Sequence, residues 1–204
     1  MKKSLATLLF VGMLSAFAQM ASAQSDKHVI SLDFGSMRNR YPFPMNNVRY
    51  DSPALTSKNI SVHARLRCYG TWFLYSHIAY DVTPWAEYPL LKNEDRFSLT
   101  AGLGADIRLR LLNDTRSESV SSAEPLVAVT SRFTINKFGM EVPLWTRFYS
   151  NGISFALQPQ FRFDVSERLA VFARYELTYL TVYGGVTNEW RQDSFIGASM
   201  KFGK

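Results

Sequence analysis

The stretch RFSLTAGLGADIRLRLL, from Arg96 to Leu112, decides the fold that this sequence predicts. Apolar residues occupy alternate positions, and small, polar or charged residues such as Asp106 and Arg108 stand between them. Alternation with period two is the spacing of a β-strand with one apolar and one polar face, whereas an α-helix would mix the two classes around its circumference. We therefore predict a strand over this stretch, longer than the usual five or six residues.

The same alternation recurs along the chain. The clearest further examples are Asn59–Tyr69, Pro125–Asn136, Met140–Tyr149, Ile153–Val165, Leu169–Tyr183 and Ser194–Phe202, with weaker ones at His28–Met37 and Trp72–Val82. Asn151-Gly152 is a strong hairpin signal between two of these strands. Pro159 falls inside Ile153–Val165, where a bulge or a locally unpaired N–H must accommodate it. Arg38–Ser57 is predicted as a loop with one optional short strand near Met45–Tyr50, and Thr83–Asp95 as a connecting segment.

The first residues have the pattern of a secretory signal. Lys2 and Lys3 precede the apolar stretch Leu5–Phe17, and Ala21-Ser22-Ala23 is an A-x-A cleavage site, so we expect the mature chain to begin at Gln24. The predicted organisation is a signal peptide over 1–23, an N-terminal segment over 24–57 with one or two optional strands, and a β-barrel over 58–204. Cys68, the single cysteine, cannot form an internal disulfide.

Several features favour a barrel that spans a membrane. After the signal, no apolar run approaches the 20 residues of a spanning helix, and a closed sheet is the other structure that can cross. Aromatic residues make up 14% of the chain. Soluble antiparallel sheets also alternate, but these polar faces carry arginine and carboxylate together. We predict an all-β, antiparallel up-and-down transmembrane β-barrel of eight strands, with ten as the alternative. Nine candidate strands are counted, and bacterial single-chain barrels have an even number of strands.

The alternation also assigns the two faces. A polar network inside the barrel is predicted for His63, Arg65, Arg67, Asp106, Arg108, Arg110, Arg162, Asp164, Arg174 and Glu176, with Arg108 and Arg110 paired to Asp106. A lipid-facing set is predicted for Phe97, Leu99, Leu103, Ile107, Leu109, Phe155, Leu157, Phe161 and Phe163. Aromatic side chains near strand ends are predicted to form interfacial girdles: Trp72, Tyr75, Tyr80, Trp85, Tyr88, Trp145, Tyr149, Tyr179, Tyr183 and Trp190. Gly102 and Gly104 are expected to make room for arginine and tyrosine side chains.

Alternating strands, short turns on one side, longer loops on the other and a closing strand that reaches Phe202 resemble the small bacterial outer-membrane β-barrel family. The resemblance covers nearly the whole mature chain. It implies a location in the outer membrane of a Gram-negative bacterium, contact with outer-membrane lipid, with lipopolysaccharide as a further candidate partner, and insertion by the barrel-assembly machinery. That machinery reads a terminal aromatic residue, whereas Gly203 and Lys204 follow Phe202 in this chain.

The sequence points to no catalytic task. His63 lies beside Ser61 on a polar face, but no nearby carboxylate is evident that would orient it as a base. We therefore predict a non-enzymatic barrel with a structural, adhesion or surface-interaction role, with no metal and no cofactor. Scattered charges argue against binding to nucleic acid. The alternatives are a soluble periplasmic or secreted barrel that binds an apolar ligand and, behind it, a lipid A-modifying enzyme that uses His63.

Overall fold

The computed structural model describes residues 27–37, 44–55, 59–69, 77–93, 96–112, 121–150, 152–182 and 189–203. The predicted signal peptide and its cleavage site lie outside these residues. Within them every regular element is a β-strand. No helix in the same described part of the chain is long and apolar enough to cross a membrane.

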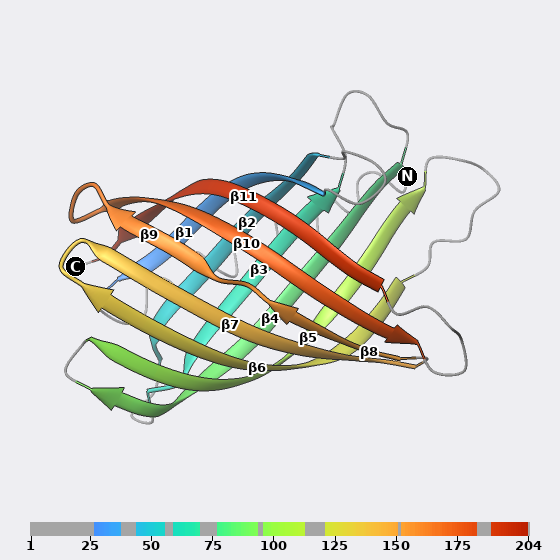
Figure 1. Ribbon diagram of the computed structural model, residues 1–204, viewed down its shortest axis with the longest axis horizontal. Coiled ribbons are helices and arrows are strands. Elements are labelled where there is room, and N and C mark those ends of the chain that lie inside the picture. Colours follow the sequence, from blue (N-terminus) through green and yellow to red (C-terminus); the bar gives the residue numbers. More distant parts are fainter. Residues whose placement is uncertain are drawn as a thin grey trace.

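The described strands form one antiparallel sheet that closes on itself (Figure 1). In chain order they are β1 (His28–Met37), β2 (Pro44–Ala54), β3 (Ser61–Tyr69), β4 (His77–Asn93), β5 (Phe97–Leu112), β6 (Ser121–Ile135), β7 (Phe138–Tyr149), β8 (Gly152–Leu157), β9 (Gln160–Asp164), β10 (Leu169–Val182) and β11 (Glu189–Phe202). Neighbours in sequence pair with one another, and β11 pairs back onto β1 from His28↔Phe202 to Met37↔Asp193. The result is an up-and-down β-barrel.

Two of the described strands are halves of one crossing. β8 and β9 both pair with β7 on one side and with β10 on the other, and the register is the same on both sides of the break. Pro159 lies in that break and has no N–H to donate, so the ladder is interrupted there, as the sequence predicts. The described barrel therefore has ten crossing strands. The prediction of eight is wrong, and the alternative of ten is correct.

The miscount has a physical cause in β2, which was only an optional strand, whereas β4 was counted through Trp72–Val82 and only its second half was missed. The sequence treated most of both as loops because they contain Pro53, Pro84 and Pro89. In the structure the β4–β5 ladder skips Thr83 and Pro84 and resumes in the same register, and a bulge follows Pro89. Each proline costs local ladder bonds without ending the strand, because the flanking residues still pair.

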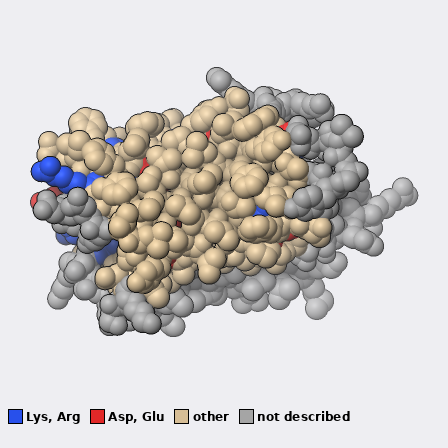
Figure 2. Space-filling model, turned by 60° about the horizontal axis from the view of Figure 1, so that its bottom comes forward, with Lys and Arg blue, Asp and Glu red and all other residues tan. Residues whose placement is uncertain are grey.

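The two faces of the sheet differ sharply. On β5, Thr100 and Asp106 are buried inside the barrel, whereas Leu103 points outward and is 71% exposed. On β11, Asp193 is buried inside and Ile196 is 71% exposed outside. The described members of the predicted lipid-facing set lie on this outer face; the side chain of Leu109 lies outside the described part. The face of the barrel wall seen in Figure 2 shows few charged side chains.

The barrel has two distinguishable ends. The tight β6–β7 and β9–β10 connections, the start of β1 at His28 and the end of β11 at Phe202 lie together at one end, here called the turn end (Figure 1). The opposite end, here called the loop end, receives the longer connections between β3 and β4, β5 and β6, and β10 and β11, which lie outside the described residues.

Candidate functional site: the charged interior and its turn-end ring

Arginine and carboxylate side chains pair inside the barrel. Arg67 donates from Nη1 to Glu176 Oε1 at 3.3 Å and from Nη2 to the second carboxylate oxygen. Arg174 Nη2 lies 2.9 Å from an oxygen of Asp33. A charge removed from water is tolerated only when a partner replaces its hydration. The interior is therefore held together by ion pairs between strands that are not neighbours.

The structure changes one predicted pairing. Arg108 Nε bonds Asp81 on β4 at 2.9 Å rather than Asp106. Asp106 instead faces Arg147 Nε at 2.8 Å and accepts a hydrogen bond from Thr83. Arg108 and Asp106 are two residues apart on one strand, and their partners lie on other strands, so alternation alone could not select them.

The predicted interior residues occupy three settings. His63, Arg65, Arg67, Asp106, Arg174 and Glu176 are buried, Arg108, Arg162 and Asp164 are partly exposed, and the side chain of Arg110 lies outside the described part. Arg162 pairs with Asp164 at 3.2 Å, and Asp164 also pairs with Lys201 near the turn end. The predicted set is thus spread along the whole interior rather than gathered at one point.

Two tryptophans fill the middle of the barrel. Trp85 and Trp145 meet edge to face with centroids 5.0 Å apart, and the guanidinium of Arg65 lies 4.2 Å above the Trp145 ring. The prediction that both rings belong to an outer girdle is wrong. The same neighbourhood explains Gly104: an added Cβ there would collide first with the Pro84 carbonyl oxygen and then with Trp85 Cβ and Cα. The small residue makes room for the Pro84–Trp85 backbone and the base of the tryptophan side chain, not for arginine or tyrosine.

Six charged or titratable side chains form a closed ring across the turn-end half of the interior, here called the turn-end ring. In order around the ring they are His63, Glu87, Arg132, Glu141, Arg49 and Asp51. The successive nitrogen–oxygen distances are 3.7, 2.7, 3.4, 2.9, 2.7 and 2.7 Å, the last closing the ring from Asp51 to His63. Nitrogen bases and carboxylates alternate around the ring, so each carboxylate lies between two nitrogen-containing side chains.

The turn-end ring crosses the barrel. Arg49 lies on β2 and Glu141 on β7, and four strands separate β2 from β7 in either direction when β8 and β9 count as one. Their 2.9 Å ion pair therefore joins opposite walls. Together with the Arg65–Gln158 hydrogen bond of 3.2 Å between β3 and the β8–β9 break, it places side chains across the path that a solute would take.

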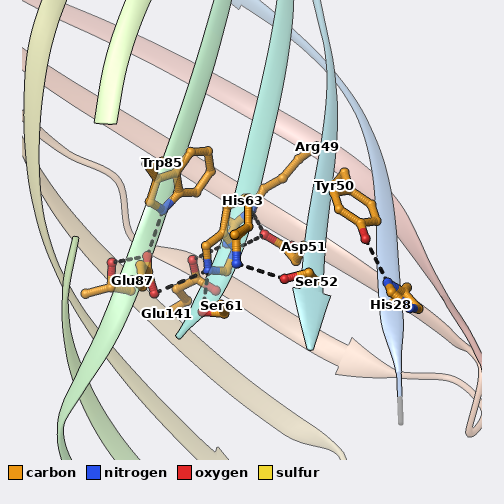
Figure 3. Close-up of polar contacts among 12 residues, drawn as sticks. His28, Arg49, Tyr50, Asp51, Ser52, Ser61, His63, Trp85, Glu87 and Glu141 are labelled. Carbon is orange, nitrogen blue, oxygen red and sulfur yellow. Dashed lines mark hydrogen bonds and ion pairs between the residues drawn. The ribbon is translucent and has the colours of Figure 1, made fainter. Parts of the chain in front are cut away.

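A hydrogen-bond chain of three residues lies within the same region (Figure 3). The Ser61 hydroxyl is 2.8 Å from His63 Nε2, and His63 Nδ1 is 2.7 Å from Asp51 Oδ1. An ionised carboxylate only accepts, so it places the proton of neutral His63 on Nδ1 and leaves Nε2 to accept from Ser61. The sequence analysis found no carboxylate to orient His63; the structure corrects this, because Asp51 on β2 occupies that place.

Sequence reasoning missed Asp51, Arg49 and Glu87 because they fell in segments predicted as loops. Met45, Asn47, Arg49 and Asp51 are alternate residues of β2, and this period of two was the available signal that they share the inner face of a strand. For Glu87 no signal stood out, because the prolines of β4 masked the alternation around it. Within the described part of the chain, no group of His, Cys, Asp or Glu could hold a metal ion.

Comparison with solved structures finds barrels of similar trace. The KdgM porin is 8% identical and matches 85% of this chain and 99% of its own, with a TM-score of 0.47. The NanC porin is 13% identical over 85% and 100%, with a TM-score of 0.45. The outer membrane protein Ail of Yersinia pestis is 13% identical over 87% and 100%, with a TM-score of 0.41. No family model and no curated protein matches the sequence.

Proposed function

We propose that the protein is an integral outer-membrane β-barrel that is closed by its own side chains and serves as an anchor for the loops at its loop end. The observation that carries the proposal is the sidedness of the wall. Large apolar side chains such as Leu103 and Ile196 face outward, and buried ion pairs such as Arg67–Glu176 lie inside. A soluble barrel needs the reverse arrangement, because water would cover its outer face and apolar residues would fill its core.

The two ends of the barrel differ in ways that support an orientation of the barrel in the membrane. Outer-membrane barrels have short turns in the periplasm and longer loops outside. The β6–β7 and β9–β10 connections and both ends of the closed sheet lie at the turn end, which we therefore place in the periplasm. On the outer face of that end, the His28 ring stacks on the Tyr50 ring, with centroids 5.9 Å apart, and on the Phe202 ring, with centroids 5.4 Å apart. Figure 3 shows His28 beside Tyr50. Aromatic rings with a polar atom suit the membrane interface.

The closed interior favours a role at the surface over a role as a pore. The Arg49–Glu141 pair and the Trp85–Trp145 contact lie across the interior. We propose a structural, adhesive or surface-interaction role, with outer-membrane lipid as the surroundings of the wall and lipopolysaccharide as a further contact. Assembly would use the barrel-assembly machinery of a Gram-negative cell after export through the predicted signal peptide. No step of this role requires catalysis.

Fractionation of the cell envelope tests the proposal. We expect the protein in the outer-membrane fraction, resistant to extraction by salt, with faster gel migration before boiling than after it. In planar bilayers the purified protein should give no steady conductance. Release by salt in a form that stays soluble without detergent would overturn the membrane assignment and favour a soluble barrel with an apolar ligand. Steady conductance in an intact barrel would overturn the proposal that the interior is closed and would leave the membrane assignment standing.

A further inference from the structure

We propose that Ser61 is a nucleophile that accepts acyl groups from small, water-soluble carboxylic esters that reach the turn end. His63 activates it by accepting the proton of its hydroxyl. This activity goes beyond the anchoring role and does not depend on it. The inference rests on three side chains from two neighbouring strands: Ser61 and His63 share one face of β3, and Asp51 faces them from β2 (Figure 3).

The geometry matches the demands of a serine nucleophile. A serine hydroxyl is a weak nucleophile until a base accepts its proton, and the base must lie within hydrogen-bond reach. Ser61 Oγ is 2.8 Å from His63 Nε2. The Asp51 carboxylate, 2.7 Å from Nδ1, holds the tautomer whose Nε2 is free to accept that proton. The nucleophile, the base and the orienting carboxylate are therefore hydrogen-bonded in the order that the chemistry requires.

The surroundings keep this arrangement rigid. Asp51 Oδ1 also accepts a hydrogen bond from Arg49 Nε at 2.7 Å. The Trp85 ring stacks on the His63 ring with centroids 5.0 Å apart and an interplanar angle of 16°. His63 is only 5% exposed, whereas Ser61 is half-buried at the first residue of β3. The base is thus held in place, and the serine is the more exposed of the two residues.

A second carboxylate is placed to stabilise the charge that forms on His63. Glu87 Oε2 lies 3.7 Å from Nε2, too far for a hydrogen bond, so a negative charge stands beside the nitrogen that takes the Ser61 proton. Glu87 is itself fixed by hydrogen bonds from Trp85, Thr100, Thr130 and Arg132. These bonds hold it as an acceptor, so it does not compete with His63 for the Ser61 proton.

The proposed reaction has two balanced steps. Ser61 Oγ attacks the ester carbonyl, His63 Nε2 takes the hydroxyl proton, and the alcohol leaves with that proton as the C–O bond of the ester breaks. Water then attacks the acyl-Ser61 ester, His63 again takes a proton and returns it to Ser61 Oγ, and a carboxylic acid leaves. The sum is hydrolysis of the ester by water, with no oxidant or other co-reactant.

Labelling with a small fluorophosphonate tests the nucleophile without knowledge of the natural substrate. The full chain, purified from membranes in detergent, should form a covalent adduct that peptide mass spectrometry assigns to Ser61, with loss of fluoride. Ser61→Ala should abolish the adduct, and His63→Gln should lower the labelling rate at least about 100-fold. Ser154→Ala is the matched control, because Ser154 is buried inside the barrel beside Tyr149 and lacks a histidine; its labelling should equal that of the unaltered protein.

Asp51 is a positioning residue and needs its own readout. Asp51→Asn should lower the labelling rate at least about 10-fold, and Asp51→Glu should restore part of it, while heat-modifiable migration shows that each variant folds. The unaltered protein should also release a burst of p-nitrophenol from p-nitrophenyl acetate, one per chain, and Ser61→Ala should release none. An intact barrel with no adduct at Ser61, or equal labelling of His63→Gln and the unaltered protein, would overturn the proposal.

Discussion

Neutralising Glu176 is the sharpest test of the buried ion pairs. Glu176 lies on β10, is 2% exposed, and accepts both hydrogen bonds from Arg67. Arg65 Nη1, also buried, lies 4.0 Å from the same carboxylate. Glu176→Gln keeps the size of the side chain and removes its charge, so two buried guanidinium groups lose their shared counter-ion. Breaking a buried pair in this way costs about 3–5 kcal/mol, because the remaining charge stays desolvated.

The matched control is Glu189→Gln on β11. Glu189 pairs with Arg191 at 3.1 Å, but both side chains are more than 40% exposed, so its loss should cost about 0.5 kcal/mol or less. Urea unfolding in lipid vesicles, followed by tryptophan fluorescence, gives both free energies of unfolding. Replacing Arg67 and Glu176 together by methionine should cost less than Glu176→Gln alone, because only Arg65, rather than both Arg65 and Arg67, then remains without its counter-ion. Equal urea midpoints for Glu176→Gln and Glu189→Gln would refute the reasoning.

Three further predictions follow from the wall and the interior. Leu103→Arg places a charge on the outer face and should cost about 2–4 kcal/mol in vesicles, as measured by urea unfolding; a cost near zero would contradict lipid contact. Gly104→Ala should lower the free energy of unfolding by about 1–3 kcal/mol through overpacking, whereas Gly139→Ala, which meets its nearest atom at 3.4 Å, should change it little; the reverse order would be inconsistent with the packing. Arg49→Ala removes the ion pair across the barrel, so planar-bilayer recordings should show conductance above that of the unaltered protein, and an unchanged trace would argue against a seal at this point.

The barrel itself could be predicted from the sequence because one physical signal repeats. Period-two alternation in β5, β10 and β11 separates two environments, and a strand shows it without knowledge of its neighbours. β2 and β4 broke the signal because their prolines look like loop residues in sequence, whereas in a closed sheet the flanking ladder bonds keep the chain extended. The strand number depended on β2, so it could not be obtained from alternation alone.

The site was less predictable than the fold, because its members come from distant strands. Alternation identified which face His63 occupies, but its partner Asp51 is set by the register of β2 against β3. In the same way, Trp85 and Trp145 were assigned to the girdle because they lie near the ends of predicted strands, and the sequence does not distinguish a girdle tryptophan from an interior one. Only closure of the barrel brings the two rings together.

Accessibility of spin labels on the wall tests the central claim most directly. In a Cys68→Ala background, nitroxides at Leu103→Cys and Ile196→Cys report the outer face, and Lys137→Cys at the β6–β7 turn reports water. In vesicles, the account predicts that oxygen reaches the labels at 103 and 196 in preference to a soluble nickel complex, with the opposite preference at 137. Labels at 103 and 196 that meet nickel as readily as the label at 137 would contradict it.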